Sequence, residues 1–156
     1  MSGIRVSSSV AAPPELVWSI VSDVTATSSW SSDVRACRWL DGATGPAVGA
    51  RFAGSSDRGP LRRWSTTSTV TVCEPGSAFG YSVRSAGRPI AEWSWTLTAA
   101  DGGCLLTHAW TDRRDWITRQ GSWLISGVRD RRSYNETAMR AALAAVAAAA
   151  ESKARG

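Results

Sequence analysis

The fold is constrained most by a run of short strands that ends in one long helix. Between residues 34 and 112, apolar and polar residues alternate in segments separated by turn signals such as Glu74-Pro75-Gly76 and Asp101-Gly102-Gly103. Because such short connections join neighbouring strands, they favour antiparallel pairing. The six predicted strands cover residues 34–40, 49–55, 63–74, 78–85, 90–98 and 104–111.

Two shorter elements are expected before this run. Residues 4–10 alternate between apolar and polar side chains, which predicts one further half-buried strand. A short helix is expected from Pro14, because proline suits the first turn and Glu15 suits its positive end. The apolar face of this helix consists of Val17, Trp18 and Val21.

The C-terminal part of the chain changes its period. After Gly121, one helix face is predicted, because its residues recur every three or four positions. Residues 141–150 are almost entirely alanine, which is the best helix former. The predicted face consists of Leu124, Val128, Arg132, Asn135, Met139, Leu143 and Val146.

These elements together predict the architecture. A sheet with one apolar face must cover that face, and the last helix is the only predicted element long enough to do so. The sequence therefore predicts an α+β fold for one domain, residues 1–156, in which a curved antiparallel sheet of about seven strands wraps a long C-terminal helix. The expected order is strand, helix, an optional second helix, six strands and the long helix. The gap between sheet and helix is expected to hold a cavity of a few hundred Å³.

Tryptophan is the unusual component of the composition. The 156 residues include nine tryptophans, which are hard to seat in one compact core because the side chain is large and carries an N–H donor. Either some of them line the hollow, or the core is bulky with partly exposed rings.

Charge and cysteine usage exclude several function classes. The formal net charge is +5, but every basic residue except Lys153 is an arginine, and the arginines are scattered, so no nucleic-acid partner is expected. The three cysteines form no C-x-x-C motif, which excludes zinc-ribbon and thioredoxin-like sites and suits a reducing, cytoplasmic location. One histidine and scattered carboxylates predict no metal and no cofactor. No apolar signal region and no run of 18 apolar residues is found, so no membrane span is expected.

Several stretches of the sequence point to a known family. They include V-A-A-P-P-E-L-V-W-S-I-V-S-D-V at 10–24, W-L-D-G-A-T-G-P-A-V-G-A-R-F at 39–52, W-S-W-T-L at 93–97 and R-D-R-R-S-Y-N-E-T-A-M at 129–139. In this order they resemble the START-like (SRPBCC) helix-grip superfamily, specifically its bacterial polyketide cyclase/dehydrase group. The resemblance implies a hydrophobic ligand in an internal cavity. It does not fix the activity, because the superfamily includes aromatases, cyclases, lipid carriers and ligand sensors.

His108 is the first candidate for chemistry. Strand alternation puts Cys104, Leu106, His108 and Trp110 on one face, which is the inward one. The imidazole is therefore either a general base near neutral pH or a hydrogen-bonded residue of the cavity wall. Members of the resembled group often carry an acidic residue here, so His108 departs from their pattern. Tyr81 is the second candidate catalytic residue.

Aromatic and hydroxyl side chains interleave on the predicted inward faces, which suits a planar or polycyclic ligand. Trp93 and Trp95 either line the cavity or belong to the core, and Asn135 either bonds the sheet or points into the cavity. Arg51 is either solvated or neutralises a ligand carboxylate at the mouth. The predicted ligand-binding residues are Trp64, Thr66, Phe79, Tyr81, Trp93, Trp95, His108, Trp110, Asn135 and Met139.

Two functions remain open at the level of the sequence. The first is an enzyme of secondary metabolism, a polyketide cyclase, aromatase or dehydratase that folds a chain in the cavity and moves protons with His108, Tyr81 or water. The alternative is a non-enzymatic carrier or sensor of a hydrophobic metabolite or lipid. With either function, the protein is expected to be a monomer or a homodimer. Two polar groups converging in the cavity favour the enzyme, and one isolated group favours the binder.

Overall fold

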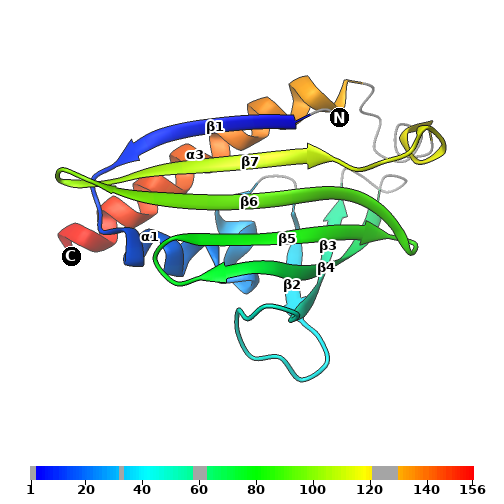
Figure 1. Cartoon of the computed structure of the whole chain (residues 1–156), viewed down its shortest axis with the longest axis horizontal. Coiled ribbons are helices and arrows are strands. Elements are labelled where there is room, and N and C mark those ends of the chain that lie inside the picture. Colours follow the sequence, from blue (N-terminus) through cyan, green and yellow to red (C-terminus); the bar gives the residue numbers. More distant parts are fainter. Residues whose placement is uncertain (1–2, 32–33, 58–62, 121–129) are drawn as a thin grey trace.

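The computed structural model describes residues 3–31, 34–57, 63–120 and 130–156. Within them, seven strands form one antiparallel sheet in the order β1-β7-β6-β5-β4-β3-β2, with the long helix α3 across one face (Figure 1). This confirms the predicted α+β fold. The elements are β1 (Gly3–Val10), α1 (Pro14–Val21), the 3-10 helix η1 (Val24–Ser29), β2 (Ala36–Trp39), β3 (Arg51–Asp57), β4 (Arg63–Glu74), β5 (Ala78–Ser85), β6 (Arg88–Ala100), β7 (Gly103–Asp112) and α3 (Arg131–Arg155).

The strand boundaries follow the turn residues. β4 and β5 begin and end where the sequence predicts. β6 runs further than the predicted 90–98 because its pairing with β7 continues to Ala100 and Gly103, next to the turn at Gly102. β3 begins at Arg51 rather than at residue 49, because Gly49 has a φ of 90°, which does not belong to an extended strand. β2 is shorter than the predicted 34–40.

The first helix fixes one side of the interior. Val17, Ile20 and Val21 are buried, whereas Trp18 is half-buried. The Trp18 indole N–H donates a hydrogen bond of 2.8 Å to the carbonyl of Ala78, which ties α1 to the start of β5. The 3-10 helix η1 follows at once and occupies the place of the optional second helix.

The long helix lies toward one side of the sheet. α3 packs most closely against β1 and α1, and α1 in turn contacts β5 and β6 (Figure 1). Of the predicted face, Arg132 is exposed and donates to the carbonyl of Gly3, while Leu124 and Val128 lie outside the described residues. The buried members of the face are Asn135, Met139, Leu143 and Val146.

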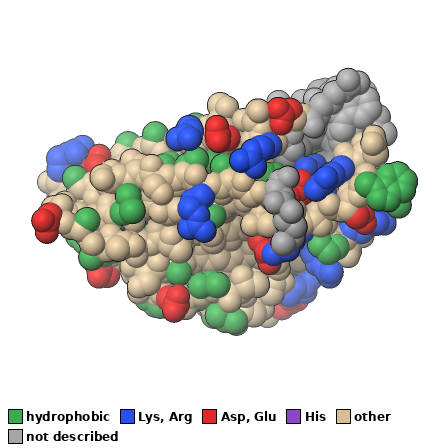
Figure 2. All heavy atoms as spheres, turned by 45° about the horizontal axis from the view of Figure 1, so that its top comes forward, with side chains coloured by type: hydrophobic (Ala, Val, Ile, Leu, Met, Phe, Trp, Pro, Cys, Tyr) green, Lys and Arg blue, Asp and Glu red, His purple; other side chains and the backbone are tan. Residues whose placement is uncertain are grey.

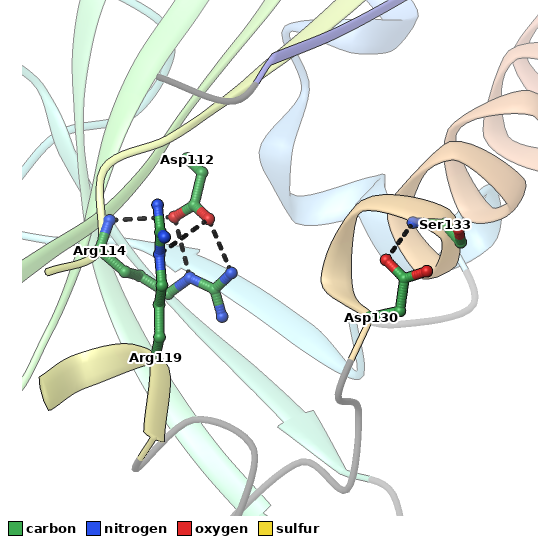
Figure 3. Close-up of polar contacts among 5 residues, drawn as sticks. All are labelled: Asp112, Arg114, Arg119, Asp130 and Ser133. Carbon is green, nitrogen blue, oxygen red and sulfur yellow. Dashed lines mark hydrogen bonds and ion pairs between the residues drawn. The ribbon is translucent and has the colours of Figure 1, made fainter. Parts of the chain in front are cut away.

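One helical turn was not expected from the sequence. Residues 116–120 are helical and follow shortly after β7, so a separate turn precedes the long helix (Figure 1, yellow, at the right). The Asp115 carboxylate accepts a hydrogen bond of 2.7 Å from the backbone N–H of Thr118, which stabilises the start of this turn. α3 begins in the same way, since Asp130 accepts from the N–H of Ser133 at 3.1 Å (Figure 3).

Two rows of inward side chains run across the sheet from β5 to β1. Phe79, Trp95, His108 and Val6 lie opposite one another on β5, β6, β7 and β1. The second row lies two residues away from the first on each strand and consists of Tyr81, Trp93, Trp110 and Ile4.

The end of β1 lies so close to the β6–β7 turn that Gly103 has no room for a side chain. A Cβ atom at this position lies 2.0 Å from the carbonyl oxygen of Val10, so the backbone must move to admit it. We expect Gly103→Ala to lower the free energy of unfolding by about 1–3 kcal/mol or more, measured by urea denaturation. Gly45→Ala is the matched control, because a Cβ atom there has no neighbour within 4 Å. Equal denaturation midpoints for the two variants contradict this packing.

Candidate functional site

A cavity of about 450 Å³ lies between the sheet, η1 and α3. Its wall is built mainly from inward side chains of β3 to β7 and from the Asn135–Ala142 part of α3. Most of the residues predicted to contact a ligand line it. They are Trp64, Thr66, Tyr81, Trp93, His108, Trp110, Asn135 and Met139.

Phe79 and Trp95 do not line the cavity. Both side chains are fully buried in the core behind its wall. The Trp95 ring is stacked on the imidazole of His108, with centroids 3.6 Å apart and planes at 11°, and it meets the edge of Trp30 at 5.4 Å and 89°. These two predicted ligand contacts therefore belong to the core, because an inward position on a strand does not by itself place a side chain in the cavity wall.

The protonation of His108 follows from its surroundings. Its Nδ1 lies 3.0 Å from the carbonyl oxygen of Ser94, and a carbonyl only accepts, so Nδ1 carries the proton and Nε2 is an acceptor. Trp93 stacks beside the ring at a centroid distance of 5.2 Å. Burial among these rings lowers the pKa of His108 from 6.5 to about 4, although the Ser94 carbonyl opposes the shift. The imidazole is therefore neutral at pH 7.

A second polar region of the cavity wall contains Tyr81, Cys37 and Thr66. Burial raises the pKa of Tyr81, and the neighbouring Cys37 adds to this shift. Burial also raises the pKa of the Cys37 thiol. Gly54 keeps this region open, because a Cβ atom there lies 3.0 Å from the hydroxyl of Thr66 and 3.5 Å from the sulfur of Cys37. Across the described part of the chain, no hydrogen bond joins Tyr81 or His108 to another titratable side chain.

The cavity meets solvent at one end. Of the lining residues, Ala86, Arg88 and Ile117 are exposed, and they lie in the β5–β6 turn and in the helical turn 116–120. Arg88 connects these two segments, because its guanidinium donates to Asp115 at 2.5 Å and to the hydroxyl of Thr118 at 3.1 Å. We refer to this end, formed by residues 85–90 and 114–118, as the mouth.

A buried ion pair stands beside the mouth. Arg114 donates to Asp112 from Nε at 2.9 Å and from Nη2 at 2.8 Å, and Nε of Arg119 lies 3.6 Å from the same carboxylate (Figure 3). Burial raises the pKa of Asp112, but the hydrogen bonds and charge of Arg114 outweigh it, so the pKa lies below its usual value. Arg114 lines the cavity although its side chain is only 10% exposed.

Arg88 and Arg114 were not predicted as site residues from the sequence. A signal was present in the strand pattern, because Asp112 continues the inward positions of Leu106, His108 and Trp110 and is buried as they are. A charged residue at an inward position requires a partner. Arg51, which the sequence left open as a ligand contact, is half-exposed, pairs with Asp41 at 2.9 Å and does not line the cavity.

The described residues contain neither a metal-binding cluster nor a membrane-spanning helix. Among them, no group of three histidine, cysteine or carboxylate side chains is placed to hold a metal ion. No helix in the described ranges is both long enough and apolar enough to cross a membrane.

The shifted pKa of His108 predicts a pH dependence of stability. Above pH 6.5 the imidazole is neutral in the folded and in the unfolded chain. Below this value the unfolded chain binds a proton that the folded chain does not take up until about pH 4, so acid favours unfolding. The full effect over this interval is on the order of 3 kcal/mol.

Urea denaturation between about pH 7.5 and pH 4.5 measures this effect. We expect the free energy of unfolding of the wild type to fall more steeply below pH 6.5 than that of His108→Gln, which has no group that titrates here. The comparison removes the contribution of the carboxylates, which both proteins share. Identical slopes mean that His108 is not held neutral by burial.

Comparisons with known proteins agree with this geometry. The family "Polyketide cyclase / dehydrase and lipid transport" matches residues 1–151. No curated protein matches the sequence. The solution structure of the Polyketide_cyc-like protein Cgl2372 from Corynebacterium glutamicum is 33% identical, with a TM-score of 0.62 over 92% of this chain and 88% of that chain.

Two more distant structures share the fold alone. The di-domain ARO/CYC protein StfQ from the steffimycin biosynthetic pathway has a TM-score of 0.76 at 15% identity, and the match covers 99% of this chain and 52% of that chain. Ara h 8.0201 has a TM-score of 0.66 at 12% identity over 97% of this chain and 98% of that chain. The family match over nearly the whole chain is the decisive finding, and this chain belongs to the polyketide cyclase/dehydrase and lipid transport family.

Proposed function

We propose that this protein binds a hydrophobic, planar small molecule in its cavity, and that Nε2 of His108 accepts a hydrogen bond from a hydroxyl group of that molecule. The observation that carries the proposal is the fixed tautomer of His108 in a wall of tryptophans. Aromatic walls favour flat apolar ligands, and a single placed acceptor orients them. The family and its fold support hydrophobic ligand binding in general.

Binding without chemistry is favoured over catalysis. A group whose pKa is about 4 is a weak base at pH 7, although it is in the correct protonation state. The raised pKa of Tyr81 makes its phenol a weak acid in turn. Since neither is hydrogen-bonded to another titratable group among the described residues, the site lacks the paired acid and base that proton transfer uses.

A cyclase or dehydratase is the second candidate function. It is favoured by the same neutral imidazole, which has its acceptor nitrogen available, and by the fold shared with the di-domain ARO/CYC protein StfQ. Dehydration of an aryl β-hydroxyketone, such as 4-hydroxy-4-phenyl-2-butanone, gives a conjugated ketone that absorbance detects. Acceleration by the wild type and its loss in His108→Gln support catalysis. No acceleration over buffer supports the binder.

The wall and the core tryptophans are expected to respond differently to truncation. Trp93→Ala removes a ring from the cavity wall, so the affinity for pyrene should fall by at least about fivefold. Trp95→Ala removes a fully buried ring and should cost about 3–5 kcal/mol of stability. Quenching of tryptophan fluorescence gives the affinity, and urea denaturation gives the stability. Unchanged pyrene affinity in folded Trp93→Ala removes this ring from the site.

The role of His108 is tested with a pair of probes that differ by one hydroxyl group. We expect the wild type to bind 1-hydroxypyrene about fivefold more tightly than pyrene, the value of one net hydrogen bond. His108→Phe keeps a flat ring but has no acceptor, so the preference should vanish. His108→Gln retains an acceptor and is expected to keep part of it. A preference that survives in His108→Phe excludes His108 as the acceptor.

A further inference from the structure

The charged residues of the cavity wall share one sign. Among the described lining residues, only Arg88 and Arg114 are charged, and both lie at the mouth. Their carboxylate partners, Asp115 and Asp112, do not line the cavity. The two carboxylates therefore bind the guanidinium groups from outside the cavity wall. Among the described residues, the charged groups that line the cavity at the mouth are both positive. Figure 2 shows basic side chains more crowded toward this right-hand end than over the rest of the visible face.

Arg114 has hydrogen-bonding capacity left after it binds Asp112. A guanidinium group has five N–H donors, and the contacts of Arg114 with Asp112 use only Nε and Nη2. Its Nη1 thus has no partner among the described residues. Nε of Arg119 approaches the same carboxylate at 3.6 Å, so two guanidinium groups of the described residues share one carboxylate. The Arg114 side chain is only 10% exposed, so water competes little for a further hydrogen bond from it.

Arg88, which also lies at the mouth, uses the same two of its three nitrogen atoms for contacts within the protein. Nη2 is bound to Asp115 and Nε to Thr118, which again leaves Nη1 without a described partner. About half of this side chain is exposed, so it stands where an entering molecule meets the protein.

We propose that the ligand of the cavity is an amphipathic acid whose carboxylate is bound at the mouth by Arg88 and Arg114, with its apolar body along Trp93 and Trp110. This inference rests on the proposed function, because it assumes that the cavity is occupied. A carboxylate matches the planar donor pairs of guanidinium groups better than a neutral group does. On β7, His108 and Asp112 are four residues apart, which is roughly 13 Å along a strand. A hydroxyl group and a carboxylate at opposite ends of a fused-ring molecule fit this spacing.

The test compares 1-pyrenecarboxylic acid with 1-pyrenecarboxamide, which has the same shape and no charge at pH 7. Dissociation constants come from quenching of tryptophan fluorescence by the full-length protein. We expect the wild type to bind the acid about tenfold more tightly than the amide, as a charge-assisted hydrogen bond provides. Arg88→Gln should reduce this preference at least about threefold. Arg114→Lys, which keeps a cation beside Asp112 but loses the planar fork, should do the same.

Arg51→Gln is the matched control, because Arg51 is exposed and paired with a carboxylate as Arg88 is, yet lies outside the cavity wall. The preference should be unchanged in this variant. Equal affinities of the wild type for acid and amide overturn the inference and leave the proposed function standing. A preference that persists in Arg88→Gln and Arg114→Lys, or that falls equally in Arg51→Gln, also overturns it. If the wild type binds neither probe, the proposed function fails and this inference fails with it.

Discussion

Among the described residues, α3 is the one long helix on the inward side of the seven-stranded sheet, and even with α1 and η1 beside it the sheet is not covered completely. α3 packs along β1 and α1, and its small side chains Ala142 and Ala150 are buried. Farther across the sheet, Thr66 and Tyr81 face a cavity of about 450 Å³ rather than a packed helix. The cavity is therefore a consequence of topology, and the aromatic residues that line it decide only its shape.

Burial inside this interior drives titratable groups toward their neutral forms. It lowers the pKa of His108 and raises those of Tyr81 and Cys37, because each charged form loses its hydration. Asp112 is the buried exception, since the two hydrogen bonds from Arg114 outweigh the loss of water. The interior thus has a neutral deep region and a charged mouth, and under the proposed binding mode this separation gives the ligand one preferred direction.

Local patterns in the sequence predict the fold well, and they predict the site in part. The turns at Gly76 and Gly87 have positive φ and lie on either side of β5, which is why the end of β4 and both ends of β5 match their predicted bounds. The alternation of apolar and polar residues predicts which side of the sheet a side chain lies on, but not whether it lines the cavity or packs in the core. Trp93 and Trp95 share one face, yet only Trp93 reaches the cavity, because depth depends on how tertiary contacts fill the space above the sheet.

The turn at 116–120 escaped prediction for a related reason. Trp116 and Ile117 are 74% and 52% exposed, so this segment has no buried apolar face that a periodic pattern could reveal. Its position is fixed instead by Arg88, which contacts Asp115 and Thr118 from a distant turn.

This arrangement bears on how a ligand is bound at the mouth. Asp112 and Asp115 already hold Arg114 and Arg88 in place, so little side-chain entropy is left for a ligand to remove. Because the Nη1 group of each arginine has no described partner, a carboxylate can bind there without breaking either ion pair. The acidic residues behind the wall are therefore positioning residues under the proposed binding mode, and the same contacts that anchor the turn 116–120 prepare the cations for an anionic ligand.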